Sequence, residues 1–239
     1  MKLNIGCGNQ KNETWIGINK ISGVYTKVLD LNIIEKLPFE NNSVEVIFMG
    51  HIIEHLTDEV NHKIFKEIFR ILKPSGLLRI VTPDFDIFLN EYNNDSYELY
   101  KSWKSAKGKP IIRGSNKAEK FVNVFISWAV SIRKKLKKRN VCFDLIEFDL
   151  KLQNEFNNLT EQEDKENFIS WIKTFIPVKE NILLLHINAF NFLRIKKFLE
   201  EAGFITIVKS EYRESKYEEL NKLAWDKLPK KSVFVESIK

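Results

Sequence analysis

The sequence opens with a short apolar run that ends in a glycine turn, Leu3-Asn4-Ile5-Gly6-Cys7-Gly8. Glycine lets the backbone turn sharply, and a ligand can touch that backbone because no Cβ atom stands in the way. A dinucleotide site would need a third glycine and a helix aimed at the pyrophosphate. Here the polar residues 9–14 lead directly to the next apolar run at Trp15, so the turn suits a ligand without a pyrophosphate.

A second group of residues that could do chemistry is His51-Ile52-Ile53-Glu54-His55. It matches H-x-x-E-H, the pattern in which two histidines one helical turn apart bind zinc beside a glutamate base. That interpretation requires a helix, whereas the segment follows the apolar run 44–49 directly. We therefore expect His51 in a loop at a strand end, predict no metal site, and keep a zinc hydrolase as a remote alternative.

Three residues are candidates for proton transfer: His51, Asp84 and His186. Asp84 follows the apolar run 77–81, so it is expected at the tip of a strand, where active-site residues of open α/β sheets gather. An ordinary imidazole, with a pKa of about 6.5, can take up a proton near neutral pH. Each of the three could equally be a hydrogen-bonded loop residue without a chemical role.

Strands and helices alternate along the chain, which predicts an α/β fold with a parallel sheet covered on both faces. A helix is expected to begin at the N-cap Thr57 and to stop at Lys73–Gly76, and another covers 191–202. The predicted strands are short apolar runs separated by turn-type residues. They cover 3–5, 15–18, 25–29, 44–49, 77–81, 204–208 and 232–235.

The alternation stops near residue 93 and resumes near 181, with only helical periodicity between. Residues 1–92 and 181–239 are thus expected to form one sheet domain, and 93–180 a helical insertion that covers the substrate site. The insertion carries 17 Lys+Arg against 12 Asp+Glu, a net of +5 out of the +6 of the whole chain.

Composition excludes several classes of protein. The chain has 239 residues and 44% hydrophobic content, which excludes wholesale disorder. Two cysteines, Cys7 and Cys142, exclude a disulfide scaffold and suit a reducing compartment. No signal peptide is expected before Leu3, and the apolar stretch 121–132 is shorter than the roughly 20 residues that span a bilayer. A cytoplasmic location is expected.

The apolar stretch 121–132 continues into a basic run at 133–139. The favoured interpretation is a helix that is buried against the sheet domain and whose basic C-terminal end lies in solvent. Association with a membrane surface through 121–139 is a second interpretation, because an apolar face beside a polybasic patch binds anionic lipids. Nucleic-acid binding is the least favoured, because no stacking pattern or RNA-binding module accompanies the basic run.

Several segments resemble the class I S-adenosylmethionine (SAM)-dependent methyltransferases, in particular a small branch with a G-C-G turn. Its motifs are found in chain order at Leu3–Gly8, Leu37–Ile47 (L-P-F-x-x-x-S-V-D/E-x-I), His51–Leu56 (H-x-x-E-H-L) and Leu72–Gly76 (L-K-P-G-G, with Ser75 for one glycine). Weaker matches follow at His186, Phe190-Asn191, Glu201–Phe204, Glu214-Ser215 and Ser232–Glu236. The resemblance covers both halves of the sheet domain and misses the insertion.

The resemblance implies a Rossmann-like, mostly parallel sheet of seven strands with helices on both faces, and SAM as the cofactor. The residues that would hold the cofactor are Asn4, Gly6, Cys7, Gly8, Asn19, Asp30, Leu31 and His51. The family usually has an acidic residue where this chain has Asn19, so a charge-assisted bond to the ribose is lost. A non-catalytic binding or scaffold protein is therefore a second hypothesis.

The resemblance also implies a methyl acceptor that is a small molecule or is linked to a glycan, lipid or peptide, methylated on oxygen or nitrogen. Catalysis would require that donor and acceptor be held in line and shielded from water. A base is needed only for a hydroxyl or a protonated amine. The oligomeric state cannot be predicted from this sequence.

Overall fold

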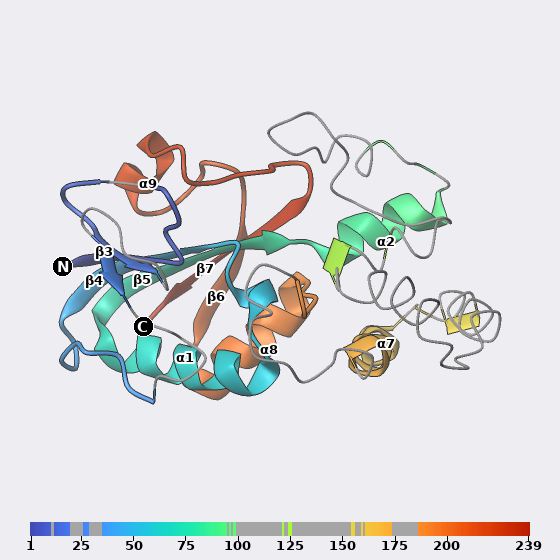
Figure 1. Cartoon of the computed structure of the whole chain (residues 1–239), viewed down its shortest axis with the longest axis horizontal. Coiled ribbons are helices and arrows are strands. Elements are labelled where there is room, and N and C mark those ends of the chain that lie inside the picture. Colours follow the sequence, from blue (N-terminus) through green and yellow to red (C-terminus); the bar gives the residue numbers. More distant parts are fainter. Residues whose placement is uncertain are drawn as a thin grey trace, which may run out of the picture. The chain divides into compact units, whose positions relative to one another are not determined.

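The computed structural model describes residues 1–10, 12–19, 26–28, 35–94, 161–173 and 186–239, together with residues 96, 98, 121, 124, 125, 154, 155 and 159. The chain forms two compact units (Figure 1). The sheet unit contains Met1–Asp84 and Phe190–Lys239, and the second unit contains Phe85–Ala189. Asp30, Leu31, Cys142 and most of 121–139 lie outside the described residues.

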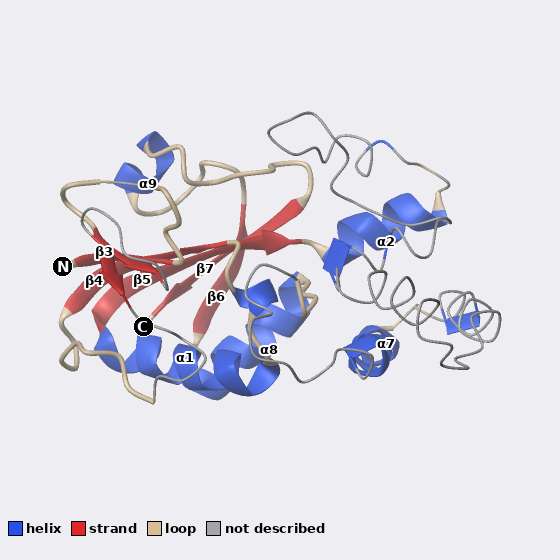
Figure 2. Cartoon of the chain, viewed as in Figure 1, coloured by secondary structure: helices blue, strands red, loops and turns tan. Residues whose placement is uncertain are grey.

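A seven-stranded sheet forms the centre of the sheet unit (Figure 2). Its strands are β1 (Lys2–Ile5), β2 (Ile16–Asn19), β3 (Thr26–Val28), β4 (Val44–Gly50), β5 (Leu72–Pro83), β6 (Thr206–Ser210) and β7 (Ser232–Ile238). The spatial order is β3-β2-β1-β4-β5-β7-β6, and β7 is the one strand of this sheet that runs opposite to the other six. The α/β class and the mostly parallel sheet are as expected. The carboxyl ends of β1 to β5 therefore share one edge of the sheet.

The connection from β1 to β2 is unusually short for two parallel neighbours. Among its described residues, 6–10 and 12–15, none is helical. The turn is held by hydrogen bonds instead, because the N–H groups of Gly6 and Cys7 donate to the carbonyl of Ile18 at 2.8 and 3.3 Å. The sequence prediction of a turn without a crossover helix is confirmed for these residues.

Two helices cover one face of the sheet, α1 (Asp58–Ile71) and α8 (Phe192–Ala202) (Figure 1). Thr57 caps α1 by accepting the N–H of Val60, and the apolar residues at helical spacing are buried against the sheet. Asn191 caps α8 in the same way. The two helices are joined where Arg194 of α8 donates to Asp58 at 2.8 Å.

The opposite face carries the short helix α9 (Glu218–Lys222) and the loops around it (Figure 1). Trp15 and Trp225 lie edge to face there, with ring centroids 4.9 Å apart, over the apolar side chains of β4 and β5. Glu219 accepts hydrogen bonds from Lys2 and Trp15 at 2.6 and 2.8 Å. Burial acts to raise the pKa of Glu219, but these bonds outweigh it and lower the pKa. This C-terminal segment therefore covers the face that a β1–β2 crossover helix would otherwise cover.

In the second unit the structure describes α2 (Phe85–Asn93) and α7 (Gln162–Lys173). Their apolar sides meet in an aromatic cluster built around Phe85. Phe121, Val124 and Phe125, at the start of the basic apolar segment, are buried in this cluster. These three residues are helical and buried, but among residues of the second unit, so the expected packing of this helix against the sheet domain stays a prediction. In the described part of the chain no helix is long and apolar enough to cross a membrane.

Two strands begin two or more residues away from their predicted first residue. β5 begins at Leu72, not Leu77, because Lys73–Gly76 form a bulge: Val44 pairs with Leu72 while Val46 pairs with Leu77. β6 begins at Thr206, because the N–H of Phe204 still bonds the carbonyl of Leu199 at the end of α8.

Candidate active site at the carboxyl edge of the sheet

The glycine turn after β1 uses its two glycines differently. Both have positive φ angles, +75° at Gly6 and +53° at Gly8. A Cβ atom on Gly6 would lie 2.8 Å from Cδ1 of Ile52, whereas one on Gly8 would meet no atom within 4 Å. Gly6 is therefore required for close packing of the turn against the loop after β4. Gly8 leaves open space beside the backbone, which is what a ligand cradle needs.

Asn4 lies on β1, two residues before Gly6, and is a buried polar residue with one side-chain atom that lacks a hydrogen-bond partner among the described residues. Its side chain is 2% exposed, and its Nδ2 donates to Oε1 of Gln10 at 3.0 Å. That bond ties the strand to the loop that follows it. Oδ1 of Asn4 is buried and has no hydrogen-bond partner among the described residues. Because an unpaired buried acceptor is costly, this oxygen is suited to a donor group of a ligand.

His51 follows β4 directly in a left-handed conformation, with φ at +54°. Its backbone N–H donates to the carbonyl of Val81 on β5 at 2.8 Å, which fixes the loop to the neighbouring strand. Nδ1 of His51 lies 3.1 Å from Oε1 of Glu54. Nε2 is buried and has no partner within the described part of the chain.

Glu54 is fully buried, and its Oε2 accepts a hydrogen bond from Oγ1 of Thr82 at 2.9 Å. It lies in the 3₁₀ turn η1 (Ile53–His55), so His51 and His55 do not stand one α-helical turn apart. The segment therefore lacks the helix that the zinc-peptidase pattern requires. From the sequence, Glu54 was as suited to fixing the loop as to chemistry. The sequence analysis missed Thr82, which directly follows the predicted strand 77–81 and belongs to no motif.

Asp84 and His186 occupy different units. Asp84 follows β5 and is buried, with its Oδ2 3.9 Å from Nζ of Lys209 and its N–H bonded to the carbonyl of Lys231. His186 belongs to the second unit, where its Nδ1 contacts the carbonyl of Val124. The carboxyl edge of the sheet thus brings together Asn4, the glycine turn, Asn19, His51 and Asp84.

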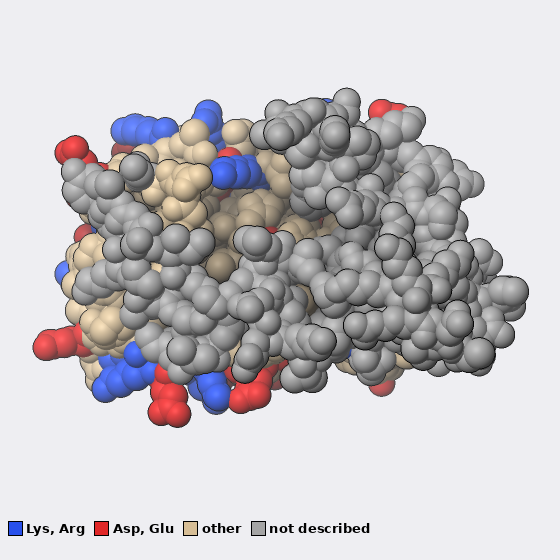
Figure 3. Space-filling view, in the orientation of Figure 1, with Lys and Arg blue, Asp and Glu red and all other residues tan. Residues whose placement is uncertain are grey.

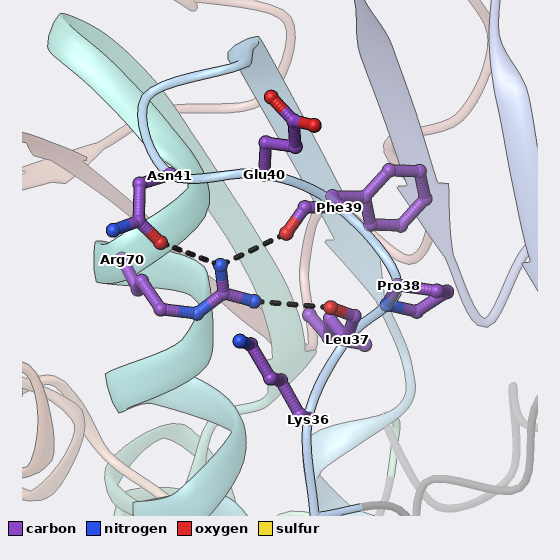
Figure 4. Close-up of a pocket in the computed structure, with 7 residues that line it drawn as sticks. All are labelled: Lys36, Leu37, Pro38, Phe39, Glu40, Asn41 and Arg70. Atoms are coloured by element: carbon purple, nitrogen blue, oxygen red, sulfur yellow. Dashed lines mark hydrogen bonds between the residues drawn. The ribbon is translucent and has the colours of Figure 1, made fainter.

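The described residues also form a hollow of about 480 Å³ beside the loop 36–41, at the other edge of the sheet (Figure 4). Arg70 lines it, but all five of its N–H groups are occupied by this protein: Glu67 takes two, and Leu37, Phe39 and Asn41 take one each. Hydrogen bonding to Glu67 raises the pKa of Arg70 further. Arg70 therefore braces the loop and offers no donor to a ligand.

Charge does not single out a binding surface on the sheet unit. In Figure 3, basic and acidic side chains of the described residues are mixed along the visible rim. Outside residues 93–180 the chain has 21 Lys+Arg and 20 Asp+Glu, a net of +1. Steering of a charged substrate by the sheet unit as a whole is therefore not expected.

Comparison with known proteins finds a family that matches part of the sheet unit. Residues 19–80 match the family described as a methyltransferase domain. The match covers about a quarter of the chain and includes β4, His51, Glu54 and α1. No curated protein matches the sequence.

Solved structures that are similar in backbone to this chain include two SAM-dependent methyltransferases. One, from Mesorhizobium loti, has 11% identity and a TM-score of 0.45 and covers 100% of this chain and 90% of its own. The other, from Aquifex aeolicus, has 12% identity and a TM-score of 0.41, with coverage of 99% and 80%. At such TM-scores these likenesses decide nothing about substrate or site residues.

The family match over residues 19–80, taken with the ordered motifs and the parallel sheet that presents a glycine turn, supports a class I methyltransferase domain in this part of the chain. A methyltransferase domain is an enzyme domain, and the ordered motifs indicate SAM as its cofactor. The described residues fit such a cofactor in two respects: the open space at Gly8 admits a ligand against the backbone, and Oδ1 of Asn4 needs a donor.

Proposed function

We propose that this methyltransferase acts on a small molecule or on a glycan- or lipid-linked acceptor, and methylates oxygen or nitrogen. Asn4, Gly6, Cys7 and Gly8 would hold the cofactor together with Asn19, Asp30 and Leu31. The observation that carries this placement is the unfilled space beside Gly8 at the carboxyl edge of the sheet.

His51 is proposed both to line the cofactor pocket and to act as the base. When bound, SAM supplies an electrophilic methyl group on a positively charged sulfur. Nε2 of His51 would take up the proton that the acceptor loses when it is methylated. Asp84 and His186 are the other candidates for this proton.

The insertion 93–180 is proposed to cover the acceptor and to exclude water from it. Parallel α/β sheets bind ligands at the carboxyl edge, and segments inserted there commonly determine specificity. Its basic run at 133–139 is the part of the chain that would attract an anionic or lipid-linked acceptor.

Calorimetry with S-adenosylhomocysteine, the demethylated cofactor, tests the proposed pocket. We expect binding by the unmodified protein and a large loss in variants of Gly8. Absence of binding by the unmodified protein would remove the basis of the proposal.

The acceptor class can be tested with SAM carrying a labelled methyl group. The protein is incubated with the aqueous and the lipid fraction of an extract, and the labelled product is analysed by mass spectrometry. Label in small glycosides or amines supports a soluble acceptor, and label in the lipid fraction supports a lipid-linked one. Label on carbon or sulfur would contradict methylation of oxygen or nitrogen.

A further inference from the structure

We infer that Glu54 is a positioning residue that fixes the tautomer of His51, so that the bare Nε2 of the ring faces the methyl acceptor. The inference rests on the proposed function in one respect, the use of Nε2 as a base. The tautomer itself follows from the contacts of Glu54, His51 and Thr82 and can be measured without any substrate.

The backbone of His51 adopts a left-handed conformation. A non-glycine residue at a φ of +54° is strained, and such strain persists only where the surroundings over-determine it. Here the N–H bond to Val81 and the contact between Ile52 and the position of Gly6 hold the loop in place. The imidazole is therefore presented by a rigid segment next to the glycine turn, not by a mobile loop.

The carboxyl group of Glu54 determines which nitrogen of His51 carries the proton. An ionised carboxylate can only accept hydrogen bonds. Its Oε2 accepts from Thr82 and its Oε1 lies 3.1 Å from Nδ1 of His51. With Glu54 ionised, this contact is a hydrogen bond only when Nδ1 carries the proton. In the neutral ring, Nε2 then holds the lone pair. A free histidine favours the opposite tautomer, so the buried carboxylate imposes this one.

Nε2 of His51 is buried and finds no donor in the described part of the chain. A buried lone pair without a donor is costly unless a ligand supplies one. When the acceptor's proton arrives there, the imidazolium lies 3.1 Å from the carboxylate of Glu54, which stabilises the new charge. This arrangement has the logic of a carboxylate that orients a catalytic histidine.

A second histidine–glutamate pair provides a matched control. Nδ1 of His62 lies 3.1 Å from Oε2 of Glu201, the same separation as in the pair of His51 and Glu54. The side chains of His62 and Glu201 are 37% and 44% exposed, whereas that of Glu54 is 1% exposed. Because solvent competes for an exposed pair, His62 should keep mainly the tautomer of a free histidine.

The experiment records two-bond ¹H–¹⁵N spectra of protein labelled at histidine, about two pH units above the ordinary imidazole pKa of about 6.5. His51→Gln assigns the signal. We expect the proton of His51 on Nδ1, its transfer to Nε2 in Glu54→Met, and no change of His51 in Glu201→Gln. A proton on Nε2 of His51 in the unmodified protein would overturn the inference, whether or not Glu54→Met folds.

Methyl transfer into the extract fractions then tests the use of Nε2. Glu54→Met should lower the rate by about 100-fold or more, the usual contribution of a positioned base. Thr82→Val, which loosens the carboxylate without removing it, should lower the rate about tenfold and keep the proton on Nδ1. An unchanged rate in Glu54→Met contradicts the inference. Failure of the unmodified protein to bind S-adenosylhomocysteine contradicts the proposed function instead.

Discussion

Arg79 on β5 lies directly opposite Glu236 on β7, and Nη1 of Arg79 donates to Oε1 of Glu236 at 3.0 Å. Both side chains are buried, at 0% and 1% exposure. The remaining N–H groups of Arg79 are also used: Asp226 accepts two of them at 3.0 and 2.6 Å, and Ser210 and the carbonyl of Glu211 accept the others. One guanidinium thus fastens β5, β7 and the segment 210–226 together.

Removal of Arg79 should be strongly destabilising, because two carboxylates would remain buried without their cation. For Arg79→Met we expect a loss of about 3–5 kcal/mol in the free energy of unfolding. Urea denaturation measures this loss. Lys63→Met is the control, since Lys63 only pairs with Glu59 on the surface. A small effect of Arg79→Met would mean that the buried network contributes little to stability.

The pair of Glu67 and Arg70 predicts a pH dependence of stability. Hydrogen bonds from Arg70, opposed by burial, lower the pKa of Glu67 from its ordinary value of 4.5. The stabilisation is therefore fully present above pH 4.5 and is lost as the pH falls through the lower, folded-state value. Glu67→Gln should cost about 1–2 kcal/mol at pH 7, and its difference from the unmodified protein should shrink towards pH 3.

Urea denaturation of both proteins at pH 7, 5, 4 and 3 measures that difference. Glu59→Gln is the matched control, because Glu59 forms an exposed pair with Lys63 four residues along the same helix. It should have little effect at any pH, since exposed pairs contribute little. A difference for Glu67→Gln that stays constant down to pH 3 would contradict the assignment of the pH dependence to this carboxylate.

Elements with strong local signals were predictable from the sequence. The N-cap Thr57 and apolar residues at helical spacing define α1, and Asn191 and Gly203 define the two ends of α8. β6 was placed two residues too early because Phe204 and Ile205 resemble the start of a strand. In the structure Phe204 packs at the end of α8, and Ile205 is 92% exposed. Local apolar character could not separate these two environments.

The contacts that organise the site are mostly non-local, so the sequence could not supply them. His51 and Asp84 were predictable as strand-end residues because parallel strands end at one edge. The bond from Thr82 to Glu54 joins residues 28 positions apart, and Asp226 reaches Arg79 over 147 positions. No periodicity or motif connects such pairs. α9 was missed for a related reason, since it is five residues long and buries only Leu220.

Gly8 offers a direct test of the cofactor placement. Gly8→Asn keeps a residue type that tolerates positive φ, yet it adds a side chain where the protein itself leaves open space. S-adenosylhomocysteine affinity should fall at least tenfold, about 1.4 kcal/mol, with little change in thermal stability. Calorimetry and thermal unfolding measure the two effects separately. Unchanged affinity would show that the ligand does not lie against this turn.

Asn19 at the end of β2 predicts a gain of affinity upon substitution. Its amide can accept a hydrogen bond from a ribose hydroxyl only as a neutral group, whereas a carboxylate accepts about twice as strongly. Asn19→Asp should therefore tighten S-adenosylhomocysteine binding about fivefold, which corresponds to about 1 kcal/mol. Asn94→Asp, which adds the same charge in the second unit, should leave the affinity unchanged. If Asn19→Asp weakens binding or leaves it unaltered, this strand end does not hold the ribose, and the pocket must be assigned to other residues of the sheet edge.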